Sequence, residues 1–140
     1  MKKMKVNDVK YFKASEILRS STAIRNGIDN TPNDPEIIEN LNYTLDRLNK
    51  IREGFGEPII INSGYRCPEV NKLVGGVTNS YHKLGLAVDL KWNKRLFEYI
   101  MENCQFDKLI REKSKTGMWI HLQFRSNPAE ERGKVIYLNV

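Results

Sequence analysis

The sequence predicts an α+β domain in which helices come first and a mostly antiparallel sheet follows, with one helix inserted between its strands. Two patterns lead to this prediction. One is a long amphipathic stretch at residues 33–53, and the other is a set of short apolar and β-branched runs, most of them later in the chain. We expect residues 1–140 to form a single domain with a core at about 12–126, because no linker or internal repeat divides them.

The clearest helix is expected at residues 33–53. Asn33 or Asp34 can cap its N-terminus, and Pro35 suits the first turn because its missing N–H has no partner there. Apolar residues at three- and four-residue steps form one stripe: Ile37, Ile38, Leu41, Leu45, Leu48 and Ile51. Glycines at 54 and 56 end the pattern. We expect this helix to pack on the sheet as a scaffold.

Shorter segments supply the other predicted elements. Residues 57–62 (EPIIIN) read as a buried strand, 68–76 as a short helix, 86–92 (LAVDLKW) as a strand and 93–104 as a second amphipathic helix. Three further strands are predicted at residues 106–112, 117–124 and 134–140. The turn KSKTG between the first two of these fits a hairpin loop.

Charge and hydropathy limit the classes of partner. The net charge of +6 could attract nucleic acid or an anionic bacterial cell wall. Acidic residues interrupt the basic ones, so no continuous basic stripe forms and we expect no nucleic-acid partner. No apolar run approaches the ~20 residues of a membrane span. The basic N-terminus also lacks the apolar stretch of a secretion signal.

His82 and Asp89 lie at the two ends of a loop-to-strand segment. His82 ends a polar, glycine-containing loop, and Asp89 follows seven residues later within an apolar strand. Side chains alternate along a strand, so Asp89 and the small Ala87 share the face opposite the leucines and valine around them. A carboxylate in such a strand needs a partner, because burying an unpaired charge is costly. A metal ion is one such partner.

The chain's other histidine, His121, lies in the strand predicted at 117–124. Alternation places it with Trp119 and Gln123, on the face opposite the apolar residues of the strand. Two histidines and one carboxylate are a sound ligand set for catalytic zinc, with water in the fourth position. The alternative is a structural aspartate and two unrelated histidines, and spacing alone does not decide between them.

Three separate motifs resemble those of the zinc D-alanyl-D-alanine carboxypeptidase family, which includes vancomycin-resistance dipeptidases and carboxypeptidases and many phage endolysins. The family motif Ser-x-His-x-x-Gly-x-Ala-x-Asp is matched at every fixed position by residues 80–89 (SYHKLGLAVD). The motif Trp-x-His is matched by residues 119–121, and an upstream Ser-Gly-Tyr-Arg by residues 63–66. Residues 12–32 resemble the N-terminal segment of members that consist of little more than this domain. The resemblance therefore covers about residues 12–124.

The resemblance implies a hedgehog/DD-peptidase-like fold, with His82, Asp89 and His121 as zinc ligands. It implies that Arg66 contacts the substrate near the scissile bond, where a guanidinium fork suits a carbonyl or carboxylate oxygen. The alternative for Arg66 is a structural arginine that ties two loops together. Ser80 is implied either to donate a hydrogen bond to the substrate or to support His82, with a structural role equally open.

The general base is implied less directly. Some family members carry an acid three positions before the second histidine, where this chain has Met118. In the subgroup that the chain resembles most, the acid lies at the end of the preceding strand, at the position of Glu112. A one-residue slip of register would turn Glu112 to the other face. The alternatives are a solvated Glu112 and Asp107 as the fallback acid.

The resemblance implies a zinc metallopeptidase that hydrolyses peptidoglycan stem peptides, as a D-Ala-D-Ala carboxypeptidase or an endolysin-type endopeptidase. We expect it to be a monomer. A competing hypothesis is a catalytically inactive cell-wall-binding or phage structural module, which Met118 favours and the complete ligand set disfavours. We expect the protein to act at the bacterial cell wall, in the periplasm or outside the cell. Because the sequence shows no secretion signal, a phage lysis protein made in the host cytoplasm fits this expectation.

Overall fold

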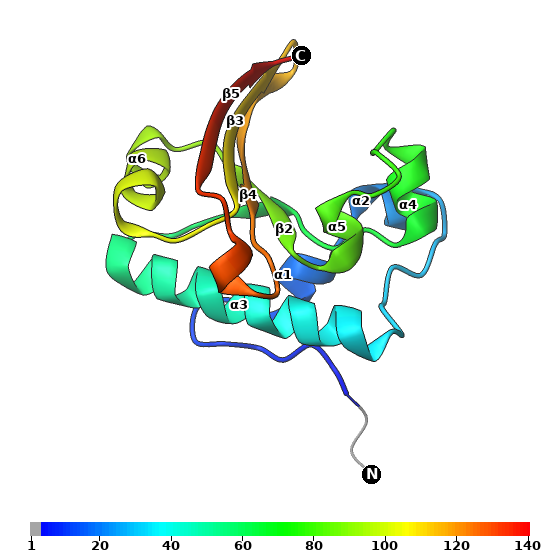
Figure 1. The fold of residues 1–140 in the computed structure, drawn as a ribbon. Helices are drawn as coiled ribbons and strands as arrows, with labels where there is room; N and C mark the ends of the chain where they lie inside the picture. Colours follow the sequence, from blue (N-terminus) through cyan, green and yellow to red (C-terminus); the bar gives the residue numbers. More distant parts are fainter. Residues whose placement is uncertain (1–3) are drawn as a thin grey trace.

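The computed structural model describes residues 4–140 and has the predicted α+β class (Figure 1). The first three residues of the basic N-terminus lie outside the described part. Helices precede and flank the strands: α1 (Ala14–Leu18), α2 (Ser21–Arg25), α3 (Pro35–Phe55), α4 (Pro68–Leu73), α5 (Tyr81–Leu84), α6 (Lys94–Asn103) and the 3-10 turn η1 (Pro128–Glu130). The strands are β1 (Ile61–Ser63), β2 (Ala87–Lys91), β3 (Lys108–Ser114), β4 (Gly117–Gln123) and β5 (Lys134–Asn139). None of the helices in residues 4–140 has the length and apolar character that crossing a bilayer requires.

The five strands form one mixed sheet, which corrects the mostly antiparallel sheet expected from the sequence. The strand order is β1-β2-β4-β3-β5, and only the β3–β5 pair is parallel. Both edges of β4 are already paired, with β2 and with β3. The next strand therefore cannot pair with β4, and it joins the sheet at the free edge of β3. β4 ends beside the start of β3, where Gln123 pairs with Lys108, and residues 124–133 lead from there to Lys134, which pairs with Lys108 from the other side. β5 therefore runs beside β3 in the same direction.

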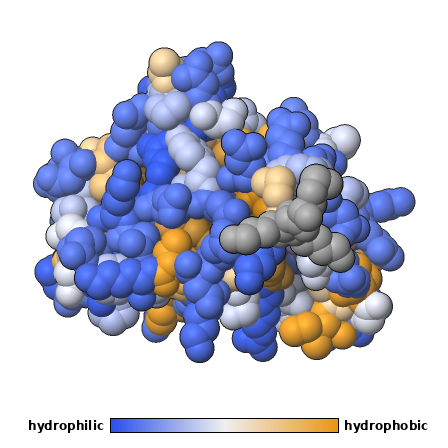
Figure 2. All heavy atoms as spheres, turned by 90° about the horizontal axis from the view of Figure 1, so that it is seen from below, coloured by the Kyte–Doolittle hydropathy of each residue, from blue (hydrophilic) through white to orange (hydrophobic). Residues whose placement is uncertain are grey.

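The long helix α3 confirms the helix predicted at residues 33–53. The Asp34 side chain caps it by accepting from the backbone N–H of Glu36 at 2.9 Å. Its apolar stripe is buried, with Leu41, Leu45 and Leu48 fully covered. Seen from the side of α3, the surface is mostly hydrophilic with small separate apolar areas (Figure 2). The helix therefore buries one face and presents a polar face to solvent.

The strand expected at residues 57–62 is shorter and less buried than predicted. β1 covers only Ile61–Ser63 at the edge of the sheet, and of the preceding isoleucines Ile59 is buried while Ile60 is exposed. The alternation predicted for the two central strands is confirmed. Val88, Leu90, Ile120 and Leu122 are all 0% exposed in the core. Asp89 and His121 consequently lie on the opposite face.

Gly85 joins α5 to β2 at a point where a side chain would not fit. Its φ is +78°, and a Cβ there would lie 2.8 Å from Cγ of Leu41 on α3. Gly85→Ala is expected to lower the free energy of unfolding by about 2–5 kcal/mol, because a left-handed non-glycine residue costs about 1–2 kcal/mol and overpacking about 1–3 more. Equilibrium urea unfolding measures this loss.

Gly56 provides the matched control for this prediction. Its φ is +81°, but a Cβ there would meet nothing within 4 Å. Gly56→Ala therefore carries only the conformational cost. An equal loss of stability in the two variants would show that contact with Leu41 contributes nothing.

Candidate metal centre

Three elements bring the predicted ligands together. His82 lies on α5, Asp89 on β2 and His121 on β4. Asp89 and His121 are direct cross-strand partners, so their side chains project from the same face. The turn at Gly85 carries α5 back to that face, and one ligand atom from each of the three residues lies within 4.8 Å of the others.

Contacts with neighbouring residues fix the His82 ring. Its Nδ1 lies 2.8 Å from the carbonyl oxygen of Gly64. A carbonyl only accepts hydrogen bonds, so Nδ1 carries the proton and Nε2 presents a lone pair. That Nε2 lies 3.4 Å from Oδ1 of Asp89. Ser80 supports the same residue, because its Oγ caps α5 by accepting from the backbone N–H of His82 at 3.2 Å.

The His121 ring faces the same carboxylate oxygen of Asp89, with Nδ1 where His82 uses Nε2. Its Nδ1 lies 3.3 Å from Oδ1 of Asp89, and its Nε2 lies 3.1 Å from Oε1 of Gln123. The centroids of the His82 and His121 rings are 5.3 Å apart and the rings are inclined by 69°. Two imidazole nitrogens and one carboxylate oxygen therefore converge on one small volume.

The chemistry of this donor set fits a divalent metal ion. When the rings are neutral and Asp89 is ionised, each of the three residues can present a lone pair to this point, and a cation can accept all three. Two imidazoles and one carboxylate match the ligand preferences of zinc and leave a position open for water or substrate. Burial alone would raise the pKa of Asp89, but hydrogen bonds and charge from the two histidines outweigh it and hold that pKa below its usual range.

Metal binding is expected to weaken as the pH falls. Burial alone would lower the pKa of His121, but the hydrogen bond and charge of Asp89 outweigh it and raise that pKa above its ordinary value of 6.5. A histidine must be neutral to bind a metal, so protons compete with the metal below the raised pKa of His121. Zinc titrations across pH 5–9 should show affinity falling from above pH 6.5. A constant affinity between pH 8 and 6 would contradict this competition.

Arg66 lies in the loop between β1 and α4 and contacts two of the candidate ligands, His82 and Asp89. Its backbone N–H donates to the carbonyl of His82 at 3.2 Å. Its Nη2 donates to Oδ2 of Asp89 at 3.3 Å, and the side chain is 18% exposed. These contacts match the tying role considered for Arg66, and they also place a permanent positive charge beside the metal-binding atoms.

Glu112 lies on the same face of the sheet as the three candidate ligands. It pairs with Trp119 in the β3–β4 hairpin, so it is the diagonal neighbour of His121. Burial, and then the charge of Asp89, raise the pKa of Glu112. Met118 instead pairs with Lys113 and belongs to the opposite face. The sequence left the register of this hairpin open, and the structure places Glu112 on the same face as His121.

Two further residues of interest lie behind the metal centre. The fallback acid, Asp107, has a fully buried carboxylate that hydrogen bonds to Gln123 and Arg132. Gln123, which contacts His121, received no functional role from the sequence. Strand alternation placed Gln123 on the same face as His121, and this was the one feature of the sequence that indicated its position beside the candidate ligand.

Comparison with known families gives a match to the model described as Peptidase M15 over residues 10–123. The chain belongs to the peptidase M15 family. The match confirms the family resemblance found in the sequence motifs and spans the three candidate metal ligands. Peptidases of this family depend on a metal, which agrees with the candidate ligand set of His82, Asp89 and His121. A search of curated proteins gives no match to this peptidase.

Proposed function

We propose that this peptidase uses zinc to hydrolyse peptide bonds in the stem peptides of bacterial peptidoglycan, as a D-Ala-D-Ala carboxypeptidase or an endolysin-type endopeptidase. The observation that carries the proposal is the convergence of His82, Asp89 and His121 in a member of the peptidase M15 family. The two histidines and one carboxylate support zinc as the metal. The sequence motifs that resemble the D-alanyl-D-alanine carboxypeptidases support the substrate.

The residues around the centre have the properties that peptide hydrolysis requires. A bound zinc ion supplies Lewis acidity, which polarises a carbonyl group and makes water a usable nucleophile near neutral pH. Glu112 accepts a proton from the attacking water and delivers it to the leaving amine. Its raised pKa makes Glu112 a stronger base, so it holds the proton more readily between the two transfers. Arg66 holds a substrate oxygen with its permanently charged guanidinium.

The register of the hairpin supports catalysis over an inactive module. The inactive-module hypothesis rests on Met118, where some family members have an acid. In this chain, position 118 belongs to the face opposite His121. An acid at that position would point away from the metal-binding atoms, so its replacement by methionine removes no proton acceptor from the site.

Digestion of purified peptidoglycan tests the proposal. The zinc-loaded protein is incubated with walls of several peptide types, with and without a chelator, and the muropeptides are identified by mass spectrometry. We expect products whose masses identify a cleaved stem-peptide bond, and the chelator should prevent their release. A protein that binds zinc but cleaves no wall type would contradict the proposal and favour the binding module. Cleavage would also support the bacterial wall as the place of action.

A further inference from the structure

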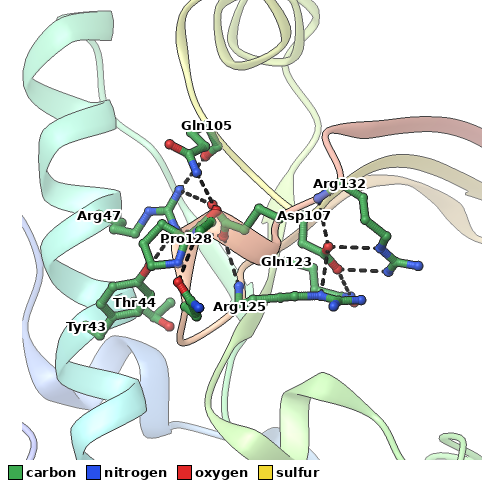
Figure 3. A network of polar contacts seen from close by, with 12 residues as sticks. Tyr43, Thr44, Arg47, Gln105, Asp107, Gln123, Arg125, Pro128 and Arg132 are labelled. Carbon is green, nitrogen blue, oxygen red and sulfur yellow. Dashed lines mark hydrogen bonds and ion pairs between the residues drawn. The ribbon is translucent and has the colours of Figure 1, made fainter.

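Four basic side chains gather beside the metal centre and have no role in the reaction described so far. Two belong to the segment that follows β4, Arg125 and Arg132, and two to neighbouring strands, Lys108 on β3 and Lys134 on β5. We call these four residues the basic cluster. Both arginines contact the carboxylate of Asp107, whose side chain is 0% exposed, and Figure 3 shows their guanidinium groups beside it.

A short series of contacts joins the arginines to a candidate metal ligand. Oε1 of Gln123 lies 3.1 Å from Nε2 of His121, and Nε2 of Gln123 donates to Oδ2 of Asp107 at 2.8 Å. Nη2 of Arg132 donates to the same carboxylate oxygen at 2.9 Å. One amide and one carboxylate therefore separate the guanidinium group of Arg132 from the ring of His121. The arginines lie at the edge of the metal centre.

The register of the sheet places the two lysines on the face that carries the metal centre. Gln123 pairs with Lys108, and Lys108 pairs with Lys134 on its other side. Paired residues share a face, so both lysines lie on the face of His121, one row along the strands. Lys108 is partly buried and Lys134 is exposed, and neither forms an ion pair within residues 4–140. Like charges on paired residues repel each other, and no acid offsets that cost here.

The buried carboxylate of Asp107 does not require the whole cluster. Its two oxygens accept four hydrogen bonds from Gln123 and Arg132 alone, which matches the number of lone pairs on a carboxylate. Nε of Arg125 lies 3.0 Å from Oδ1 but forms no hydrogen bond with it. Within residues 4–140, Nη1 of Arg132 and both terminal nitrogens of Arg125 also donate to nothing. The two side chains are 35% and 29% exposed, so a ligand can reach these free donors.

The positive charge does not serve the metal or the neighbouring acids either. Cations close to a metal site repel a divalent ion and oppose its binding. Of the two acids in residues 124–133, Glu131 pairs with Arg47 on α3 at 2.7 Å (Figure 3). Glu130 is exposed and forms no ion pair in the described part of the chain. One carboxylate, Asp107, cannot neutralise four cations, so the cluster keeps an excess of positive charge that suits an incoming anion.

We propose that the basic cluster is a subsite that binds a free carboxylate of the substrate peptide close to the scissile bond. A guanidinium fork matches the two oxygens of a carboxylate, and Asp107 already holds the arginines in place, which lowers the ordering cost of binding. Adjacent rows on one face of a strand are about 7 Å apart, the length of about two residues of extended peptide. This inference rests on the proposed function and adds an acidic residue near the cleaved bond to the description of its substrate.

Hydrolysis of matched synthetic stem peptides tests the subsite. Four peptides are compared with the zinc-loaded protein: the D-glutamate carboxyl is free or amidated, and the C-terminus is free or amidated. We expect amidation of one of these carboxyls to raise KM while kcat changes little, because the lost contact is made equally in the ground state and the transition state. The position whose amidation raises KM identifies which carboxylate is bound.

Variants of the cluster should remove this discrimination. The double variant Lys108→Gln, Lys134→Gln should raise KM for the preferred peptide by about 2- to 30-fold, the combined effect of two partly exposed ion pairs. Its KM for the amidated partner peptide should stay unchanged. Arg125→Gln should act in the same direction and leaves the hydrogen bonds of Asp107 intact. Lys113→Gln removes the same charge from the opposite face of β3 and should leave every KM unchanged.

Equal KM values for all four peptides in the wild type would overturn the inference while leaving the proposed function standing. Equal changes in KM for free and amidated peptides in the lysine double variant would overturn it too. If the wild type hydrolyses none of the peptides, the proposed function fails, and NMR titration of the zinc-loaded protein with the same four peptides decides on the subsite. Tighter binding of a free-carboxylate peptide, lost in the double variant, would support the subsite without any cleavage. Binding that does not distinguish free from amidated peptides would exclude it.

Discussion

Asp89→Ala is expected to abolish stoichiometric zinc binding and, with it, peptidase activity. Asp89 supplies the one negative charge among the three converging ligands, and its Oδ1 lies 3.3 and 3.4 Å from the ring nitrogens of His121 and His82. Without it, two neutral imidazoles remain, beside the positive charge of Arg66. Loss of a ligand should therefore lower zinc affinity by more than the ~10- to 100-fold typical of an outer partner.

Metal analysis and thermal unfolding measure this loss in parallel. Zinc at about 100 times its dissociation constant should stabilise the wild type by about 2.7 kcal/mol, and it should leave the melting temperature of Asp89→Ala unchanged. Asp46→Ala, on the exposed face of α3, removes the same side chain away from the site and should bind zinc normally. His82→Ala and His121→Ala should behave like Asp89→Ala. Normal zinc content in all three ligand variants would exclude this metal centre.

The ligand positions could be predicted because strand alternation is a local property. Asp89 and His121 each stand between core residues of a short apolar strand, which is enough to place each one on the outer face of its strand. Their direct pairing could not be read from either strand alone. The family motifs linked the two strands, and the register then put both side chains on one side of the sheet.

The parallel pairing of β5 and the burial of Asp107 depend on long-range contacts. The sequence of residues 134–140 does not show that both edges of β4 are already paired. Its pattern is therefore compatible with pairing to β4 or to β3. Asp107 precedes β3 and looks like an ordinary acid beside a strand. Its burial arises from Arg132, 25 residues later, and its link to His121 passes through Gln123. Such a set of contacts exists only once residues 124–133 have folded against the sheet.

Glu112→Gln is expected to leave zinc binding intact and to lower kcat by about 10²- to 10⁴-fold, the usual contribution of a positioned general base. The glutamine keeps the shape of the side chain but cannot take a proton from water. Glu112 is a diagonal neighbour of His121 in the ladder, with Cα atoms about 7–8 Å apart, which is within reach of a long side chain across a bound water. It coordinates nothing in the ligand set, so metal content should not change.

The pH dependence of turnover separates a lost base from a disturbed site. Burial and the charge of Asp89 raise the pKa of Glu112, so wild-type activity should fall with decreasing pH at values above the ordinary ~4.3 of a glutamate. With zinc in excess, so that the metal site stays occupied, the residual activity of Glu112→Gln should lack that acidic limb, because glutamine does not titrate. Lys113→Gln changes the exposed side chain next along the same strand, on the other face, and should keep both kcat and the pH profile.

Unchanged turnover in Glu112→Gln would move the general base to another residue. Loss of zinc from that variant would instead make Glu112 part of the metal centre itself.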